Sequence, residues 1–279
     1  MKLNFFKMQA QGNDYLFFDF LNKPVPDTDF SILSLQICDR HFGVGADGIV
    51  LILPDSSNDA LMRIFNANGS EAEMCGSALI SVISYLSKKT KKKDFSINTK
   101  SGVKTGEILN NWPIGINVKS ENIVKQKIPV VKVNMGIPSF LSVNKKIFDF
   151  EGSVVSMGNP HFVTFLDSLS DEILFEFGPQ IEGNQDFPKG INVEFAKIVD
   201  QSSVNVKVWE RGSGATLACG TGACAVTFSG IKYKLLNDIV KVNFPGGTLF
   251  VKYDGKFIFL IGEVAYVFSG IYELQTSKM

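Results

Sequence analysis

Apolar and polar residues alternate with a period of two in many short runs of the chain. Such runs lie at 16–20, 130–134, 204–208 and 248–253. Alternation of this kind is typical of strands with one buried face. Near the C-terminus, Gly246 and Gly247 after Pro245, and Asp254 with Gly255, each separate two such runs and predict hairpins. The pattern predicts a protein dominated by strands, with few helices.

Two segments depart from this alternation and predict helices, each beginning just after a Cys-Gly pair. The first runs from Ser77 to Leu86 and the second from Thr221 to Phe228. Apolar residues occupy most faces of both, which indicates burial. The sequence Met-Cys-Gly-Ser-Ala at the first start is echoed by Ala-Cys-Gly-Thr-Gly at the second. This weak internal duplication predicts two halves.

The predicted linker lies at 110–127, where Asn, Pro, Gly and Lys accumulate between strand-like runs. We therefore expect a first domain at 1–118, joined by a returning C-terminal segment at about 266–279. The second domain is expected at 119–265.

Composition favours a globular protein with a small-molecule partner. A chain of 279 residues with 45% hydrophobic content can bury a substantial core. Its 28 basic and 28 acidic residues cancel, so no overall field favours nucleic acid or an anionic membrane. The five lysines at 88–93 lack the aromatic residues of a nucleic-acid surface and are expected to be a solvated face. Without a signal-like or membrane-spanning segment, a cytoplasmic location is expected.

Four cysteines in a chain of this length do not resemble a disulfide framework. Cys38 lies among apolar residues and Cys224 lies inside the second predicted helix, so both are expected to be small buried hydrophobes. Cys75 and Cys219 each immediately precede a helix start, where the positive end of the helix dipole favours a thiolate. Their repeated setting favours a chemical role over simple burial.

Two thiols suit the inversion of an α-carbon without a cofactor. Inversion needs a base on one face of the carbon and an acid on the other, and an ordinary thiol pKa near 8.5 allows thiolate and thiol to coexist after modest tuning. The free N–H groups at each helix start can also hold a carboxylate.

The chain also carries a set of ordered blocks typical of one family. These blocks are Phe-Gly-Val-Gly-Ala-Asp-Gly at 42–48, Phe-Asn-Ala-Asn-Gly-Ser-Glu-Ala-Glu-Met-Cys-Gly at 65–76, Met-Gly-Asn-Pro-His at 157–161, Gly-Ile-Asn-Val-Glu at 190–194, Trp-Glu-Arg-Gly at 209–212 and Leu-Ala-Cys-Gly-Thr-Gly at 217–222. In them the chain resembles the diaminopimelate epimerases from Gly12 to its end. The resemblance implies conversion of L,L-diaminopimelate to the meso isomer, for lysine and peptidoglycan precursors, without a cofactor and in a homodimer.

The fold that the resemblance implies is α+β. Two similar domains, each a curved, mostly antiparallel β-sheet or barrel wrapped around a central helix, would place the active site in the cleft between them. The resemblance assigns Cys75 and Cys219 as the acid/base pair, with His161 and Glu210 assisting. The substrate-binding residues that it implies are Asn13, Asn66, Gly76, Ser77, Asn159, Asn192, Glu210, Arg211, Gly220 and Thr221.

These assignments suit a substrate with two amino-acid ends, of which only one is inverted. Arg211 can bind a carboxylate through its planar fork of donors, and asparagines supply both donors and acceptors to a zwitterion. Taken alone, asparagines beside glycine are most often turn residues, His161 would be structural, and Arg211 beside Glu210 would be a local ion pair. The family resemblance reverses these preferences.

The chain departs from the family pattern after Cys75, where the family usually continues Gly-Asn-Gly-Ala-Arg-Cys. Here Ser77 replaces the asparagine, Ala78 the glycine and Ile80 the arginine. If Ala78 is helical, its N–H stays available to an anion, whereas a positive φ would require a reshaped loop. In addition, Gln9 stands where histidine is frequent, and Ala215 where glutamate is common.

Two other functions compete with this interpretation. A related two-thiol racemase, acting on histidine or hydroxyproline, would keep the chemistry, but proline-type relatives usually have histidine where Ser77 stands. A thiol redox protein would cycle Cys75 and Cys219 through a disulfide, yet the sequence has no Cys-x-x-Cys motif. No zinc-like ligand spacing is present, and the glycine-rich run 43–48 lacks the lysine of a phosphate loop.

Overall fold

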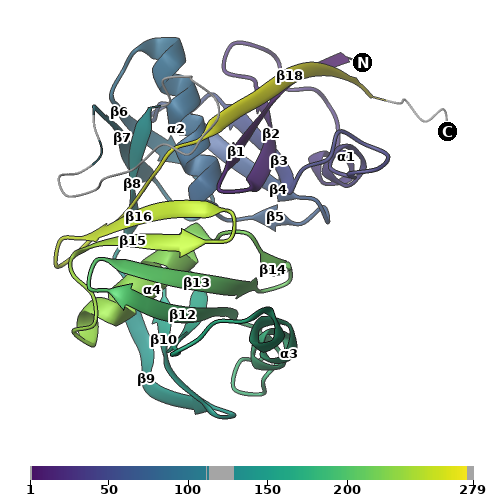
Figure 1. Cartoon of the computed structure of the whole chain (residues 1–279). Helices are drawn as coiled ribbons and strands as arrows, with labels where there is room; N and C mark the ends of the chain where they lie inside the picture. Colours follow the sequence, from purple (N-terminus) through teal and green to yellow (C-terminus); the bar gives the residue numbers. More distant parts are fainter. Residues whose placement is uncertain (1, 111, 113–128, 275–279) are drawn as a thin grey trace. The chain divides into compact units, whose positions relative to one another are not determined.

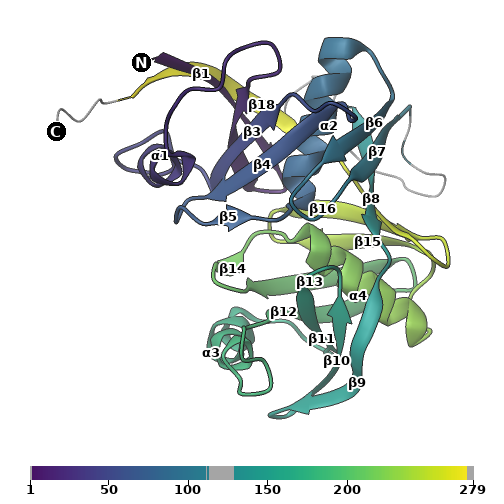
Figure 2. The same cartoon turned by 180° about the vertical axis from the view of Figure 1, so that it is seen from behind.

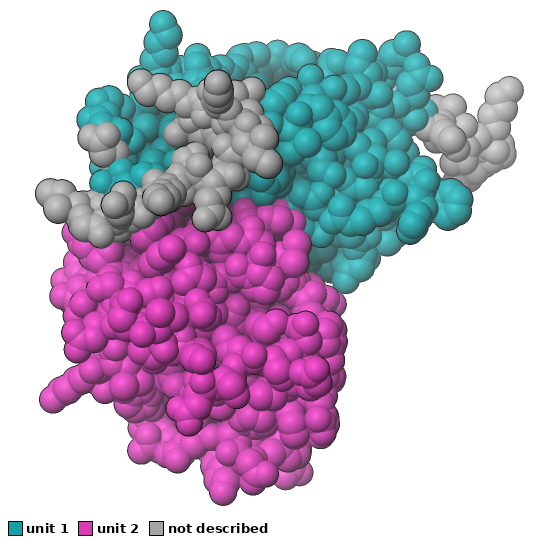
Figure 3. Space-filling model, in the orientation of Figure 1, with its two compact units in different colours: residues 1–10, 14–132, 263–279 teal, residues 11–13, 133–262 magenta. Residues whose placement is uncertain are grey.

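The computed structural model describes residues 2–110, 112 and 129–274 of the chain. Its contacts divide the protein into two compact units, coloured separately in Figure 3. Unit 1 comprises residues 1–10, 14–132 and 263–279, and unit 2 comprises residues 11–13 and 133–262. The expected boundary at 118/119 and nearly all of the expected linker lie outside the described residues. The domain limits given above therefore stay a prediction.

Strands make up most of both units. In the first half of the chain the elements are β1 (Lys2–Ala10), β2 (Asn13–Asp19), α1 (Phe30–Ile37), β3 (Gly48–Leu53), β4 (Ala60–Asn66), β5 (Glu71–Ala72), α2 (Gly76–Thr90), β6 (Asp94–Asn98) and β7 (Lys104–Leu109). They continue with β8 (Val130–Gly136), β9 (Ser139–Ile147), β10 (Phe150–Ser156), β11 (Pro160–Phe165), α3 (Asp171–Glu182), β12 (Asn192–Asp200), β13 (Ser203–Glu210), β14 (Gly214–Thr216), α4 (Gly220–Lys232), β15 (Ile239–Phe244), β16 (Gly247–Tyr253), β17 (Ile258–Gly262) and β18 (Ala265–Glu273).

The two units repeat one order of elements. In unit 1, β2 pairs parallel with β3 and β4 pairs parallel with β6, while β3 and β4 are antiparallel. In unit 2, β11 pairs parallel with β12 and β13 parallel with β15, while β12 and β13 are antiparallel. Helix α1 connects β2 to β3 as α3 connects β11 to β12, and α2 and α4 each follow a two- or three-residue strand. The predicted α+β fold of two similar, mostly antiparallel domains is confirmed.

The two predicted helices are confirmed, and both are buried. Helix α4 packs against β10, β11, β12, β15, β16 and β17, so that the strands of unit 2 surround it (Figures 1 and 2). Helix α2 packs against β1 and β7 of unit 1. Both extend past the predicted ends, and the exposed lysines at 88–93 begin in the last turn of α2.

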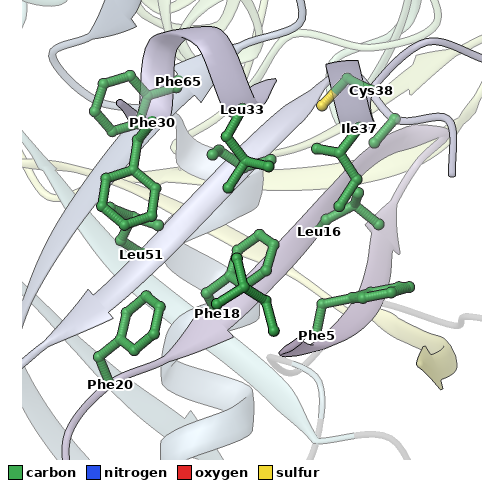
Figure 4. Packing of buried hydrophobic residues seen from close by; sticks show 13 residues of the cluster. Phe5, Leu16, Phe18, Phe20, Phe30, Leu33, Ile37, Cys38, Leu51 and Phe65 are labelled. Atoms are coloured by element: carbon green, nitrogen blue, oxygen red, sulfur yellow. The ribbon is translucent and has the colours of Figure 1, made fainter. Parts of the chain in front are cut away.

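The sheet of unit 1 is covered on both faces, which explains why β2 is almost continuously buried. On the α2 face, the Phe6 ring stacks on Tyr85 of the helix, with 4.4 Å between ring centroids. On the other face, Phe5 and Phe18 belong to a cluster with Leu33 of α1 (Figure 4). Helix α3 covers an equivalent cluster in unit 2.

Helices α1 and α3 were not predicted from the apolar pattern. Asp29 caps α1 by accepting from Ser31 N at 2.8 Å, and Ser170 caps α3 by accepting from Ile173 N at 3.2 Å. The predicted hairpins are confirmed, because β15 pairs with β16 and β16 with β17, both antiparallel. No helix within the described part of the chain is long and apolar enough to span a membrane.

Candidate active site

Cys75 and Cys219 are the N-cap residues of α2 and α4. Both have extended backbone, and each carbonyl accepts the first intrahelical hydrogen bond, from Leu79 N and Ala223 N respectively, at 2.9 Å. The N–H groups of the next three residues have no acceptor in the helix backbone. The predicted anion-binding residues at these two helix starts are Gly76, Ser77, Gly220 and Thr221. Both cysteines therefore stand beside N–H groups suited to a carboxylate.

The departure after Cys75 leaves the helix start intact. Ala78 is the third residue of α2 and does not have a positive φ. Ser77 is buried, and its carbonyl accepts from Ser81 Oγ at 2.9 Å. The Ala78 N–H thus keeps the position that anion binding requires, and no reshaped loop is needed.

Tyr15 contacts the first cysteine and was not identified from the sequence. Its hydroxyl donates to Cys75 Sγ at 3.5 Å, within the limit for a bond to sulfur. Gly48 makes room for this ring, because a Cβ there would lie 2.8 Å from Tyr15 Cε1 and 2.5 Å from the Phe65 carbonyl oxygen. The glycine is therefore required for the tyrosine to reach the sulfur.

An ionic cluster fixes the start of β2, next to the predicted substrate residue Asn13. Asp14 accepts from Lys7 Nζ at 2.6 Å and from Arg40 Nη2 at 2.7 Å, and Arg40 also bonds Asp47 at 2.8 Å. Burial alone would raise the pKa of Asp14, but the hydrogen bonds from Arg40 and Lys7 bring it below its ordinary value. The glycine-rich block at 42–48 thus contributes to this cluster, because the Gly45 carbonyl accepts a hydrogen bond from Lys7 at 2.6 Å.

The predicted residue Asn66 ends β4, opposite Gly48 and nine residues before Cys75. Its amide nitrogen donates to Ser70 Oγ at 3.0 Å, and its backbone N–H donates to the Ser70 carbonyl at 2.8 Å. These bonds close the turn that leads to the cysteine. Asn13, at the start of β2, groups with unit 2 by its contacts.

Cys219 lies in a cluster of polar groups within unit 2. Its sulfur accepts from Gly222 N at 3.4 Å and lies 3.4 Å from Thr221 Oγ1. Glu210 bonds this thiol and also accepts from Thr216 Oγ1 at 2.5 Å. Glu210, which the resemblance implies as an assisting residue, thus contacts the second cysteine.

The Gly222 N–H at the helix start lowers the pKa of Cys219 as expected, but the net shift is upward, so the expected preference for a thiolate is wrong. Burial, followed by the negative charges of Glu210 and Glu194, raises the pKa of this thiol well above its ordinary value. The hydrogen bonds from Thr221 and Gly222 act in the opposite direction but are outweighed. Burial also raises the pKa of Glu210, which makes that carboxylate a better proton acceptor. Cys219 is consequently held as a neutral thiol whose proton faces a base.

His161 is completely buried and bonds two partners. Its Nδ1 lies 2.6 Å from Glu194 Oε1, and its Nε2 lies 3.1 Å from Asn159 Oδ1. The Asn159 amide nitrogen in turn donates to Thr221 Oγ1 at 3.4 Å. The buried carboxylate of Glu194, which carried no predicted role, thus begins a chain of hydrogen bonds that runs through His161 and Asn159 to Thr221 at the start of α4.

Asn192 connects three segments of unit 2 at the strand ends. Its amide nitrogen donates to the Pro160 carbonyl at 2.9 Å, and its amide oxygen accepts from Arg211 N at 3.0 Å. The Arg211 side chain is exposed and donates to the Lys189 carbonyl at 3.5 Å. Gly190, with φ +71°, makes room for it, because a Cβ there would lie 2.9 Å from Arg211 Cγ.

The strand registers show which residues correspond between the units. Tyr15 pairs with Gly48 across β2 and β3, and His161 pairs with Asn192 across β11 and β12. Tyr15 follows Asn13 by two residues, as His161 follows Asn159. Tyr15 and His161 are therefore equivalent, and this repeated spacing is the signal that could have identified the tyrosine.

Cys38 and Cys224 are both buried, as predicted. Burial raises the pKa of Cys38 to about 12 and also raises the pKa of Cys224. Over the described ranges, no group of three or more His, Cys, Asp or Glu side chains is placed to hold a metal ion.

Comparison with known proteins identifies the family. The model of the family described as "Diaminopimelate epimerase" matches residues 5–140 and 153–267. The chain belongs to the diaminopimelate epimerase family. A diaminopimelate epimerase from Carboxydothermus hydrogenoformans is 42% identical over 98% of this chain and 100% of its own length. Another from Halothermothrix orenii is 39% identical over 99% of both chains.

The predicted family is thereby confirmed, and the protein is an amino-acid epimerase, an isomerase. A solved structure of a hydroxyproline epimerase from Agrobacterium vitis has a TM-score of 0.70 to this chain and covers 99% of it, with 94% of its own length matched. Its sequence identity is only 12%, so the likeness shows a shared fold. Sequence relatedness favours the diaminopimelate epimerase family over the hydroxyproline-type alternative.

Proposed function

We propose that the protein converts L,L-diaminopimelate to meso-diaminopimelate with Cys75 and Cys219 as the acid/base pair. The main support for this proposal is that both cysteines are the N-cap residues of buried helices, at corresponding points of two repeated units. In each unit a strand ends nine residues before the cysteine, at Asn66 and at Glu210. Membership of the family supports this choice of substrate.

In the proposed reaction, one thiolate removes the α-proton, so that a C–H bond breaks and an S–H bond forms. The other thiol delivers its proton to the opposite face, which inverts the carbon. When Cys219 acts as the base toward the α-carbon, its own proton must first leave. Glu210 accepts that proton, since the two groups are hydrogen-bonded. The N–H groups at a helix start stabilise the negative charge that develops on the substrate carboxylate.

We assign the second amino-acid end of the substrate to polar side chains at the strand ends. The exposed guanidinium of Arg211 offers a planar pair of donors to the distal carboxylate. Asn66, Asn159 and Asn192 supply both donors and acceptors, which a zwitterion requires. Holding this end fixes which α-carbon meets the thiols.

We further propose that the reaction uses no pyridoxal phosphate and serves lysine and peptidoglycan precursor synthesis in the cytoplasm. Thiol acid/base chemistry supports the first point, because it supplies both proton transfers from the chain itself. The resemblance to the family supports a homodimer, which sedimentation analysis of the purified protein tests.

The test follows deuterium entry at the α-carbon by proton NMR, with L,L-diaminopimelate in heavy water under reducing conditions. Wild-type protein is expected to give exchange and meso product. Cys75→Ser and Cys219→Ser are each expected to abolish epimerisation, and Cys38→Ser is the matched control. Unchanged epimerisation in either active-site variant would refute the two-thiol mechanism, and no exchange by folded wild-type protein would refute the substrate.

A further inference from the structure

Glu182, the last residue of α3, binds the turn that carries Arg211. Its Oε2 accepts from Trp209 Nε1 at 2.6 Å, and its Oε1 accepts from Gly212 N at 2.7 Å. Both distances are short for N–H donors, as is usual when the acceptor is a carboxylate. The two donors lie on either side of Glu210 and Arg211 in the sequence. One carboxylate thus clamps the segment that carries two residues of the site.

Arg211 lies in a tight turn between β13 and β14. The Ser213 N–H donates to the Glu210 carbonyl at 3.0 Å, and Gly212, the third residue of the turn, has φ +75°. This combination is typical of a type II turn, in which the central peptide has one defined orientation. The N–H of that peptide is the group that Glu182 receives. The carboxylate therefore fixes the peptide that directly follows Arg211.

Helix stability does not explain a carboxylate at this position. The C-terminal end of a helix carries partial negative charge and favours cations over anions. The corresponding helix of unit 1, α1, ends in the apolar residue Ile37, whereas α3 ends in Glu182. The N–H donors of the turn compensate the negative charge, which points to a role of Glu182 in the turn.

Unit 1 supplies an internal comparison. The strand of unit 1 that corresponds to β13 is β4, and the residue after its end, in the place of Arg211, is Ala67. Helix α1 meets that turn through backbone and apolar groups instead. A Cβ on Gly69 would lie 3.2 Å from the Ser31 carbonyl oxygen and 3.3 Å from Leu35 Cδ1. The carboxylate clamp is therefore found where the turn carries an arginine, and packing suffices where it carries an alanine.

The Arg211 and Glu182 side chains both border Gly190. A Cβ on this glycine would lie 2.9 Å from Arg211 Cγ and 3.6 Å from Glu182 Cγ. Because both carboxylate oxygens receive N–H donors of the turn, the guanidinium bonds the Lys189 carbonyl instead. On the other side of the turn, Asn192 Oδ1 holds the Arg211 N–H at 3.0 Å. The exposed guanidinium thus keeps its charge available to an anion.

We propose that Glu182 is a positioning residue that clamps the turn at 209–212 and thereby holds the Arg211 guanidinium in place for the distal carboxylate of the substrate. This inference rests on the proposed function and deepens it, since it assigns the residue that fixes the group binding the distal end. The Trp209 ring packs against the apolar cluster of unit 2, so the clamp ties the turn to the core.

Nitrogen-15 NMR of the Trp209 indole and the Gly212 amide reads the clamp without substrate. The chain has two tryptophans, and Trp112→Phe leaves the Trp209 indole signal alone. In wild-type protein both protons are expected at low field, because each donates to a carboxylate. Glu182→Gln offers an acceptor to only one of the two donors, so at least one signal is expected to move upfield. Two unshifted signals in this variant overturn the clamp.

Kinetics with L,L-diaminopimelate test the action through Arg211. Glu182→Gln and Glu182→Asp are each expected to raise KM about tenfold and to leave kcat within about twofold, since the thiols are untouched. The aspartate keeps the charge but is too short to reach both donors, so it separates geometry from charge and serves if the glutamine variant fails to fold. Glu176→Gln, an exposed change on α3, is the control. An unchanged KM overturns the proposal, as does a lowered KM in Glu182→Gln, which removal of a negative charge alone would give.

A double-mutant cycle separates positioning from a general loosening of unit 2. In an Arg211→Gln background, Glu182→Gln is expected to change kcat/KM by less than about twofold, because the group that it positions is gone. A further loss of about tenfold in that background would show that Glu182 acts on another group, and it overturns the proposal.

The two hypotheses fail in different ways. Wild-type protein that does not turn over diaminopimelate contradicts the proposed function, while the indole and amide signals still decide whether the clamp exists. Active wild-type protein with an unchanged KM in folded Glu182→Gln contradicts the positioning role alone.

Discussion

The Tyr15 hydroxyl and the Cys75 sulfur form a hydrogen bond of 3.5 Å within unit 1. A hydroxyl that donates to sulfur stabilises the thiolate over the thiol. In unit 2 the equivalent residue is His161, while the bond to the thiol comes from Glu210. The two cysteines therefore differ in their partners, because Cys219 has the carboxylate of Glu210 beside it in addition to the donor Gly222 N, although their backbone settings match.

Tyr15→Phe is expected to slow alkylation of Cys75 at neutral pH by about fivefold, since a hydrogen bond worth about 1 kcal/mol is lost from the reactive thiolate. Iodoacetamide labelling followed by peptide mass mapping measures the rate at this residue. Tyr85→Phe, which removes a bond to Asp19 instead, is the matched control. Equal rates in wild type and Tyr15→Phe would show that the hydroxyl does not act on the sulfur.

Glu210→Gln is expected to change how stability depends on pH. Burial raises the pKa of Glu210 above 4.5, so the folded state favours the neutral carboxyl. The stabilising contribution of this carboxyl is complete at low pH and is lost as the pH rises through the raised pKa. The unfolding free energy, measured in urea at about pH 4 and pH 8, should therefore fall less between these two pH values in the variant than in wild type. Identical losses would contradict the raised pKa.

The same variant is expected to lose most epimerase activity, because Cys219 would have no carboxylate to accept its proton. Alkylation of Cys219 should not fall with activity, because removing the negative charge of Glu210, which raises the pKa of this thiol, favours the thiolate. Retained activity would exclude Glu210 as the proton acceptor.

Asp14→Asn is expected to destabilise the protein by about 3 kcal/mol, since Lys7 would remain nearly buried without its carboxylate. The lowered pKa of Asp14 means that its contribution is present above an ordinary pKa of 3.8 and is lost as the pH falls. Urea unfolding near pH 7 measures the difference, with the exposed Asp27→Asn as control. A change below about 0.5 kcal/mol would place this cluster among weak surface pairs.

Gly222→Ala is expected to reduce both stability and activity. Alanine normally stabilises a helix by about 1 kcal/mol relative to glycine, but here its Cβ would lie 2.6 Å from Glu194 Oε1 and 3.2 Å from Cys219 Cβ. Thermal unfolding and the exchange assay measure the two effects. Gly183→Ala, at the end of α3, meets only a 3.4 Å contact and is the control. Stabilisation by Gly222→Ala would show that Glu194 can move without cost.

The sequence predicted the strands, the two buried helices and the repeated Cys-Gly starts, because these depend on local periodicity and on short motifs. Helices α1 and α3 were missed, although Asp29 and Ser170 offered capping signals. Helix α1 is only eight residues long, and α3 contains Pro179, so neither gave a long apolar pattern.

The tertiary structure decided the chemical environment of the site. The helix start beside Cys219 predicted a lowered thiol pKa, but burial and the carboxylates of Glu194 and Glu210 reverse the direction. Glu210 lies nine residues before Cys219 and Glu194 lies 25 residues before it, and no local pattern predicts how strand pairing brings both charges to one sulfur. The sequence by itself determined which residues could act, and only the folded arrangement determined which of them hold, donate or accept a proton.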